Sequence, residues 1–216
     1  MNYKKLLDDL LFQLEAYSSV YRKSTQPFIR SKISSHFPGY VSDFEHEIIR
    51  ESLLEHVGSL PVIASYLHPY LDEAVDLGKS LTMMAIHDIG ELIVGDQLTY
   101  AKSAEQGSGE FTAAMGLLHE NYKSLYEEMD RLVTNEAKFV KSVDKLAPNL
   151  LDYICGEDYF IGRMTSQAGW PAKEAIMNVR KNKRPFMEWS KFLTAFHDEL
   201  FLRFKSIAED KSPAPL

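Results

Sequence analysis

The sequence predicts an all-α fold, and three observations support this. Apolar residues recur at helical spacing through most of the chain, almost no segment alternates apolar and polar residues as a strand does, and the breakers between the helical patterns are short. The chain has 216 residues, of which 45% are hydrophobic, so one domain could bury roughly 70% of its unfolded surface. We therefore expect a single domain over residues 1–216.

The first half of the chain contains three predicted helices. The first covers about residues 3–22, with leucines on one stripe, and an irregular stretch with prolines follows at about residues 24–43. The second covers about residues 45–67, and we expect Pro61 to kink or split it, because proline lacks an N–H group. The third covers about residues 72–93 and ends before Gly95.

The second half is also predicted to be helical. Ser, Gly and Gln residues predict a loop at about residues 102–109, before a long helix over about residues 110–133. Thr134 marks the start of another helix, and a strong amphipathic pattern covers about residues 186–207. Residues 210–216 read as a frayed tail.

Composition excludes several classes of partner. The formal net charge is −7 and no long basic stripe is present, so we expect no nucleic-acid partner. Cys155 is the single cysteine, which excludes an intrachain disulfide and is compatible with a reducing compartment. The N-terminal segment does not resemble a signal peptide, and no apolar run reaches the length of a membrane span. We expect a cytoplasmic protein without a membrane partner.

The pair His87-Asp88 is the strongest functional signal. It interrupts an apolar run at residues 81–91 that would otherwise form core. Burying an imidazole and a carboxylate costs free energy unless hydrogen bonds, an ion partner or a metal compensate. A buried ion pair and a metal site both remain open from this pair alone.

Further candidate residues lie on predicted inward helix faces: Glu55-His56 and Asp144-Lys145. Glu91 follows His87 by four residues and Asp88 by three, which brings its carboxylate to the same side of one helix. Imidazole and carboxylate ligands suit a borderline or hard divalent ion, and an incomplete ligand set leaves positions for water and substrate.

These residues resemble the signature of the HD-domain metal-dependent phosphohydrolases, which is a first His, a His-Asp pair and a later Asp. The corresponding residues are His56, His87-Asp88 and Asp144. The closer likeness is to bacterial 5′-deoxynucleotidases of the YfbR type and their eukaryotic HD-domain relatives. It extends over residues 47–152 through further matching strings, which are Arg50-Glu51-Ser52, Glu91, Gly95-Asp96, Thr134, Glu136-Ala137 and Lys145.

The resemblance implies a helical HD bundle with a core of about residues 45–155 and a C-terminal helical extension of about residues 156–209. It also implies that His56, His87, Asp88 and Asp144 bind a divalent metal ion, with Mn, Co, Mg, Fe, Ni and Zn undistinguished. Glu91 and Asp96 would assist catalysis. The implied reaction is hydrolysis of (deoxy)nucleoside 5′-monophosphates to nucleoside and phosphate, and the implied assembly is a homodimer.

The chain departs from these relatives around the substrate. Relatives place Ser directly after the first His, whereas here Val57-Gly58 precedes Ser59, and the segment 31–46 lacks their tryptophan near the sugar. Arg30 and Arg50 are both candidates for the arginine expected upstream of His56, and Lys145 is a further candidate for substrate binding. The sequence therefore predicts no sugar preference.

Two alternatives stay open at this stage. HD domains also include enzymes that hydrolyse nucleoside triphosphates or alarmones as pyrophosphohydrolases. A metal-stabilised HD module that binds a nucleotide or a partner without turnover is the alternative of another class. Glu91 and Asp96 favour an enzyme.

Overall fold

The computed structural model describes residues 17, 20–25, 50–96, 104–155 and 157–210. This part of the chain is helical, as predicted, apart from one pair of short antiparallel strands. The strands are β1 (Tyr21–Thr25) and β2 (Arg50–Ser52), and the α-helices are α3 (Leu53–Leu67), α4 (Leu77–Ile86), α5 (Glu91–Val94), α6 (Ala104–Leu117), α7 (Glu120–Asp130), α8 (Asn135–Cys155), α9 (Glu157–Ala168), α10 (Ala172–Lys183) and α11 (Lys191–Asp210). Short 3-10 helices follow α3 and α10, η1 (His68–Tyr70) and η2 (Arg184–Phe186).

The strand pair corrects two predicted helix boundaries. Tyr21 lies opposite Ser52 and Thr25 opposite Arg50, so the end of the predicted helix 3–22 is strand, and the second helix begins at Leu53 instead of near residue 45. The N–H of Leu53 donates to the carbonyl of Val20 at 3.0 Å. Local periodicity could not show this pairing, because its partners are about thirty residues apart. The predicted helix before Tyr17 and residues 26–43 of the predicted irregular stretch 24–43 lie outside the described residues, whereas Ser24 and Thr25 belong to β1.

Helix α3 begins with a capping box and continues through Pro61. The hydroxyl oxygen of Ser52 accepts from the N–H of Glu55, and the Glu55 carboxylate accepts from the N–H of Ser52 at 2.7 Å. The predicted split at Pro61 is wrong. Burial of Leu60 and Ala64 on either side of the proline offsets the backbone hydrogen bond that it cannot make.

The predicted single helix over residues 72–93 is two helices joined by a turn. Asp76 caps the start of α4 by accepting from the N–H of Lys79, and α4 ends at Ile86. His87 to Gly90 form the turn, and α5 follows. A Cβ atom on Gly90 would lie 2.3 Å from the carbonyl oxygen of Glu110, so glycine lets the backbone of α6 approach this turn. The close approach decides where α4 ends, and it is a tertiary contact.

Two further boundaries differ between α6 and α8. The predicted loop at 102–109 is helical from Ala104 onward, and the predicted helix 110–133 is divided into α6 and α7. His119 caps α7, since its Nδ1 accepts from the N–H of Asn121 at 3.3 Å. The predicted helix start at Thr134 is confirmed, because its hydroxyl oxygen accepts from the N–H of Ala137.

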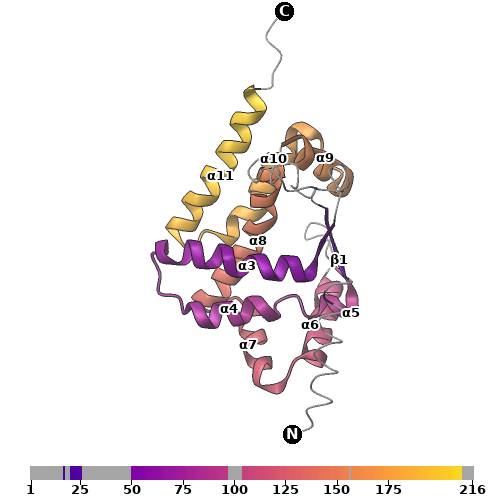
Figure 1. Ribbon diagram of the computed structural model, residues 1–216, viewed down its shortest axis with the longest axis vertical. Coiled ribbons are helices and arrows are strands. Elements are labelled where there is room, and N and C mark those ends of the chain that lie inside the picture. The colour runs from indigo at the N-terminus through magenta and orange to yellow at the C-terminus, as the bar shows by residue number, and fades with distance from the viewer. Residues whose placement is uncertain (1–16, 18–19, 26–49, 97–103, 156, 211–216) are drawn as a thin grey trace, which may run out of the picture.

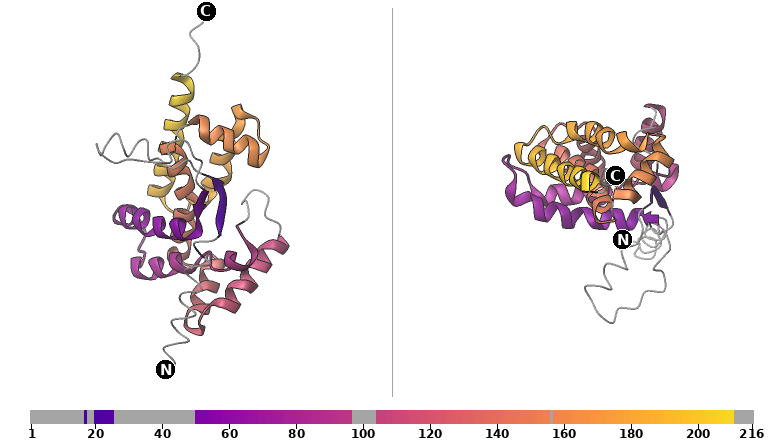
Figure 2. Two further views of the ribbon diagram at one scale, coloured as in Figure 1. Left: turned by 45° about the vertical axis from the view of Figure 1, so that its right-hand side comes forward. Right: turned by 90° about the horizontal axis from the view of Figure 1, so that it is seen from above.

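Helix α8 connects the two ends of the molecule. At one end it packs against α3, α4 and α7, and at the other against α9 and α11 (Figures 1 and 2). The predicted extra C-terminal helices are present as α9, α10 and α11, and they enclose a second apolar cluster that includes Phe160, Val179 and Phe204. The last helix starts at Lys191 and not at residue 186, because η2 and a turn precede it. No helix among the described residues combines the length and the hydropathy that crossing a membrane requires.

Candidate metal centre

Three helices bring the four predicted metal ligands together. His56 lies on the buried face of α3, His87 and Asp88 lie in the turn after α4, and Asp144 lies on α8. His56 Nε2 is 3.5 Å from Asp144 Oδ1 and 3.8 Å from Asp88 Oδ2. His87 Nε2 is 3.0 Å from Asp88 Oδ2 and 3.9 Å from Asp144 Oδ1. The side chains of His56 and Asp144, almost ninety positions apart in the sequence, therefore lie together in the interior of the protein.

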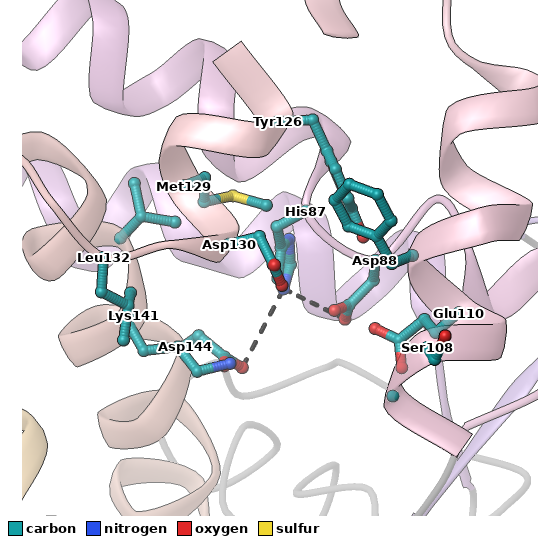
Figure 3. Close-up of a pocket in the computed structure, with 13 residues that line it drawn as sticks. His87, Asp88, Ser108, Glu110, Tyr126, Met129, Asp130, Leu132, Lys141 and Asp144 are labelled. Atoms are coloured by element: carbon teal, nitrogen blue, oxygen red, sulfur yellow. Dashed lines mark ion pairs between the residues drawn. The ribbon is translucent and has the colours of Figure 1, made fainter. Parts of the chain in front are cut away.

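The orientation of His87 fits a metal ligand. Its Nδ1 lies 2.8 Å from the carbonyl oxygen of Met84, which can only accept, so Nδ1 carries the proton and donates. In the neutral ring Nε2 carries a lone pair, and this nitrogen faces the oxygens of Asp88 and Asp144 (Figure 3). Lone pairs of an imidazole and two carboxylates repel one another unless a cation or a proton lies between them. The donor set of two imidazoles and two carboxylates suits a divalent ion.

Asp144 is held in its ionised form. Burial alone would raise its pKa, but the ammonium groups of Lys145 and Lys141 and the ring of His56 hold the pKa of Asp144 well below its usual range. Lys145 Nζ lies 2.8 Å and Lys141 Nζ 3.5 Å from Asp144 Oδ2. Asp144 is thus a charged ligand at neutral pH, while its second oxygen is anchored by the two lysines.

A second group of acidic side chains adjoins the first. One oxygen each of Asp88, Glu91 and Glu110 lies within 4.8 Å of the others. Glu91 is buried at the start of α5, directly after the turn that carries Asp88. The approach of α6 to Gly90 brings Glu110 to the same place. This group places a buried carboxylate, Glu91, beside one of the candidate ligands.

Two tyrosines lie close enough to these carboxylates to respond to their charge. Burial raises the pKa of Tyr17 strongly, and the negative charges of Asp88 and Glu91 raise it further. Burial likewise raises the pKa of Tyr126, with added contributions from Glu110 and Asp88. Both phenols therefore stay protonated at neutral pH and can donate hydrogen bonds at the edge of the site.

A cavity of about 360 Å³ opens directly onto the ligands. His87, Asp88 and Asp144 lie at one end, and the rest of the wall combines apolar with polar and charged side chains (Figure 3). The apolar members of this wall are Phe111, Tyr126, Met129, Leu132 and Val140. The charged members beyond the ligands are Glu110, Asp130 and Lys141. A cavity with ligating groups at one end and several apolar side chains in its wall can hold a small molecule that combines an anionic group with a ring.

The other predicted site residues have different positions. Asp96 is buried just after Gly95, whose φ of 75° ends α5, and it is not among the described residues that line the cavity. Lys145 is buried and contacts Asp144, but it does not line the cavity either. The backbone of Arg50 is in β2, whereas its side chain and all of Arg30 lie outside the described part of the structure.

Ser59 contacts His56, although it lies three residues after this histidine and not directly after it as in the relatives that the sequence resembles. Ser59 Oγ donates to the carbonyl oxygen of His56 at 2.7 Å. The hydroxyl therefore supports the backbone of the ligand from one helical turn further along α3.

Sequence reasoning missed four residues of this region: Tyr17, Glu110, Tyr126 and Lys141. Lys141 precedes Asp144 by three residues on one helix, and this spacing is a signal that could have assigned it to the site. Glu110 and the two tyrosines come from other elements, and only the packing of those elements brings them near Asp88.

A family model described as HD domain matches residues 42–169, more than half of the chain. The chain belongs to the HD domain family. The matched residues include all four candidate ligands and both candidate catalytic carboxylates, and they include α3, α4 and α8.

Solved structures share the fold. One is a crystal structure of a protein from Magnetospirillum magnetotacticum named a predicted metal-dependent phosphohydrolase, with a TM-score of 0.69, 21% identity and coverage of 95% of this chain and 94% of that one. A conserved hypothetical protein from Pyrococcus furiosus has a TM-score of 0.55, 21% identity and coverage of 89% and 97%. A protein from Pyrococcus horikoshii has a TM-score of 0.54, 18% identity and coverage of 92% and 99%. A search of curated proteins finds no match to this chain.

Proposed function

We propose that the protein is a metal-dependent phosphohydrolase that converts (deoxy)nucleoside 5′-monophosphates to nucleoside and phosphate. One observation carries the proposal. The Nε2 lone pair of His87 and the oxygens of Asp88 and Asp144 converge at the polar end of an open cavity, where substrate can reach them. Membership of the HD domain family supports this reading, as does the fold shared with a protein named a predicted metal-dependent phosphohydrolase.

The four ligands would hold a divalent ion, which supplies positive charge for the phosphoryl oxygens and lowers the pKa of a coordinated water. Glu91 would accept the proton of the attacking water, since its buried carboxylate lies beside Asp88. Asp96 would help to position the water or protonate the leaving 5′-oxygen, a role that rests on the family resemblance. Lys141 would contact the phosphate from the cavity wall, and Lys145 would keep Asp144 charged.

The charge of the cavity favours a monophosphate over a polyphosphate. Among the described lining residues Lys141 is the single lysine or arginine, whereas Asp88, Glu110, Asp130 and Asp144 are carboxylates. A bound divalent ion would neutralise the charge of two carboxylates and leave little positive charge for a second or third phosphate. The apolar side chains in the wall suit the ring of a nucleoside, and the cavity volume suits one small molecule.

A phosphate-release screen tests the proposal. The purified protein is incubated with nucleoside 5′-monophosphates and triphosphates and with each of Mn, Co, Mg, Fe, Ni and Zn, beside Asp88→Ala. We expect inorganic phosphate from at least one monophosphate and about 1,000-fold less from Asp88→Ala, since a metal ion supplies several kcal/mol of charge stabilisation. Pyrophosphate or triphosphate as the main product would instead identify a pyrophosphohydrolase. Equal activity of Asp88→Ala would exclude the metal assignment.

A further inference from the structure

Leu132 has a backbone conformation that L-amino acids rarely adopt. Its φ is 53°, and it is the one residue other than glycine with a positive φ in the part of the chain that the structure describes. In this left-handed region the Cβ atom of an L-residue crowds the backbone, whereas glycine has no such atom. A leucine at this position therefore costs folding free energy that a glycine would not.

The position of Leu132 is one that helices usually give to glycine. Helix α7 ends at Asp130, Arg131 is its C-cap, and Leu132 follows the cap. The N–H of Leu132 donates to the carbonyl oxygen of Met129 at 3.2 Å, as the left-handed residue after a helix does. Glycine is the most common residue there, and asparagine is the usual substitute. The turn itself therefore does not explain why the residue is leucine.

Contacts around the turn hold this conformation. Thr134 Oγ1 donates to Glu128 Oε1 at 2.5 Å, and Lys79 Nζ lies 2.6 Å from the same oxygen. Thr134 also accepts from the N–H of Ala137 in α8. Helices α4, α7 and α8 are thus joined around the turn, which allows one strained residue to persist.

Packing in the core does not explain the leucine either. Leu132 is half-buried, but it belongs to neither of the two apolar clusters that the described residues form. The other apolar residues of the cavity wall are part of the larger cluster or pack against it; they are Phe111, Tyr126, Met129 and Val140. The side chain of Leu132 instead lines the cavity. A strained apolar residue outside the core indicates a contact with a molecule that enters the cavity.

We propose that Leu132 is a specificity-determining residue that packs on the ring part of the substrate, the nucleoside; this inference rests on the proposed function. Figure 3 shows Leu132 on the same side of the cavity as Lys141, and Glu110 and Ser108 on the other side. Because Lys141 would contact the phosphate, an apolar side chain on its side is placed to contact the ring attached to that phosphate. Leu132 thus favours nucleoside monophosphates over small acyclic phosphate esters.

Leu132→Asn separates this role from a role in the turn. Asparagine adopts the left-handed region more readily than leucine, so the variant keeps the turn and removes the apolar surface. We expect the KM for the best deoxynucleoside 5′-monophosphate to rise about tenfold and kcat to stay within about twofold, because a contact made equally in the ground state and the transition state is lost. The KM for glycerol phosphate, which has no ring, should stay within about twofold, and the thermal midpoint should not fall.

Two control variants are matched to this change. Leu132→Met keeps an apolar side chain at the same position and should keep the KM within about threefold of the wild type. Val133→Asn changes the next residue, which is 66% exposed and is not among the described lining residues, and should leave the KM unchanged. An unchanged KM in Leu132→Asn would overturn the proposal, as would a lower thermal midpoint with equal losses on both esters.

Nucleoside binding separates this inference from the proposed function. The four common 2′-deoxynucleosides are titrated into the wild type and into Leu132→Asn in EDTA and followed by ligand-observed NMR, which requires neither metal nor turnover. We expect the dissociation constant of at least one nucleoside to rise about tenfold in the variant. Absence of phosphate release would then refute the proposed function alone. Equal nucleoside affinities in the two proteins, or no binding by either, would overturn the role of Leu132.

Discussion

Two histidine–aspartate pairs, one in the turn after α4 and one on α11, show why adjacency of the two residue types does not identify a metal centre. In the candidate centre, His87 precedes Asp88 and its Nε2 lies 3.0 Å from that carboxylate. In the C-terminal helices, His197 precedes Asp198 and its Nδ1 lies 3.4 Å from that carboxylate. Both imidazoles are buried.

The two regions differ in the charges that surround the pair. Asp198 accepts hydrogen bonds from Arg180 at 3.1 Å and from Arg184 at 3.2 Å, and Arg184 also donates to Glu188, so two guanidinium groups balance two carboxylates. Asp88 instead lies among two imidazoles and the carboxylates of Glu91 and Glu110. The C-terminal cluster is therefore neutralised by the protein itself. In the candidate centre, the carboxylates of Asp88, Glu91, Glu110 and Asp144 outnumber Lys141 and Lys145, which leaves negative charge that a cation would neutralise. The surrounding charge, and not the dipeptide, distinguishes a site from a structural contact.

The largest expected difference between the two regions is in activity. Asp88→Asn removes one charge from the ligand set and should lower phosphate release about 1,000-fold, which corresponds to a loss of about 4 kcal/mol in transition-state stabilisation. Asp198→Asn is the matched change in the other cluster and should keep activity within about twofold, since no described residue of α11 lines the cavity. Initial rates under saturating metal provide the measurement. Comparable losses in both variants would contradict the distinction.

Metal removal should lower the stability of proteins with an intact candidate centre and leave a variant of that centre unaffected. A ligand present at about 100 times its dissociation constant adds about 2.7 kcal/mol to the free energy of unfolding, which raises the thermal midpoint by about 5–10 °C in a chain of this length. We expect EDTA to lower the midpoint of the wild type and of Asp198→Asn by this amount and to leave that of Asp88→Asn nearly unchanged. Differential scanning calorimetry measures the midpoints, with metal content checked by mass spectrometry. An equal drop in the midpoint of Asp88→Asn and of the wild type would argue against metal binding at Asp88.

A smaller effect is expected from the arginine cluster. Burial would raise the pKa of Asp198, but hydrogen bonds from Arg184 and Arg180 hold it below its usual value. A lowered pKa adds stability above the unfolded pKa of aspartate, and that stability is lost as the pH falls through the lower folded pKa. Asp198→Asn should therefore reduce the free energy of unfolding by about 1 kcal/mol at neutral pH and by less below about pH 4. Urea unfolding at both pH values measures the difference, and a constant deficit would show that the charge is not responsible.

The smallest effect concerns the buried ring of His197. Burial lowers its pKa despite the hydrogen bond to Asp198, so the folded state binds this proton less readily than the unfolded state does. Stability should then fall as the pH drops below about 6.5, the ordinary histidine value. His197→Phe keeps a ring against Phe201, which lies 4.7 Å away, and should remove this part of the pH dependence. The control is His119→Asn, at an exposed helix cap, which should leave the pH profile of unfolding as in the wild type. Identical profiles for His197→Phe and the wild type would show that His197 is not the source of this pH dependence.

The sequence was informative wherever the signal is local. Helical spacing predicted the all-α class and the C-terminal helices, and Thr134 marked the start of α8 correctly. The predictions of one helix over 72–93 and of another over 110–133 were wrong, because periodicity does not register a turn of four residues such as the one at 87–90. That turn exists because Gly90 meets the backbone of Glu110, twenty residues away.

By itself the sequence determined the helical class and the identity of the four candidate ligands, since residue type and motif spacing are properties of the chain. Tertiary structure decided that His87 and Asp88 leave their helix and turn toward His56 and Asp144. It also decided that Glu110, Tyr17 and Tyr126 join Asp88. These outcomes depend on contacts between residues that are distant in the chain, and such contacts form only when the helices pack.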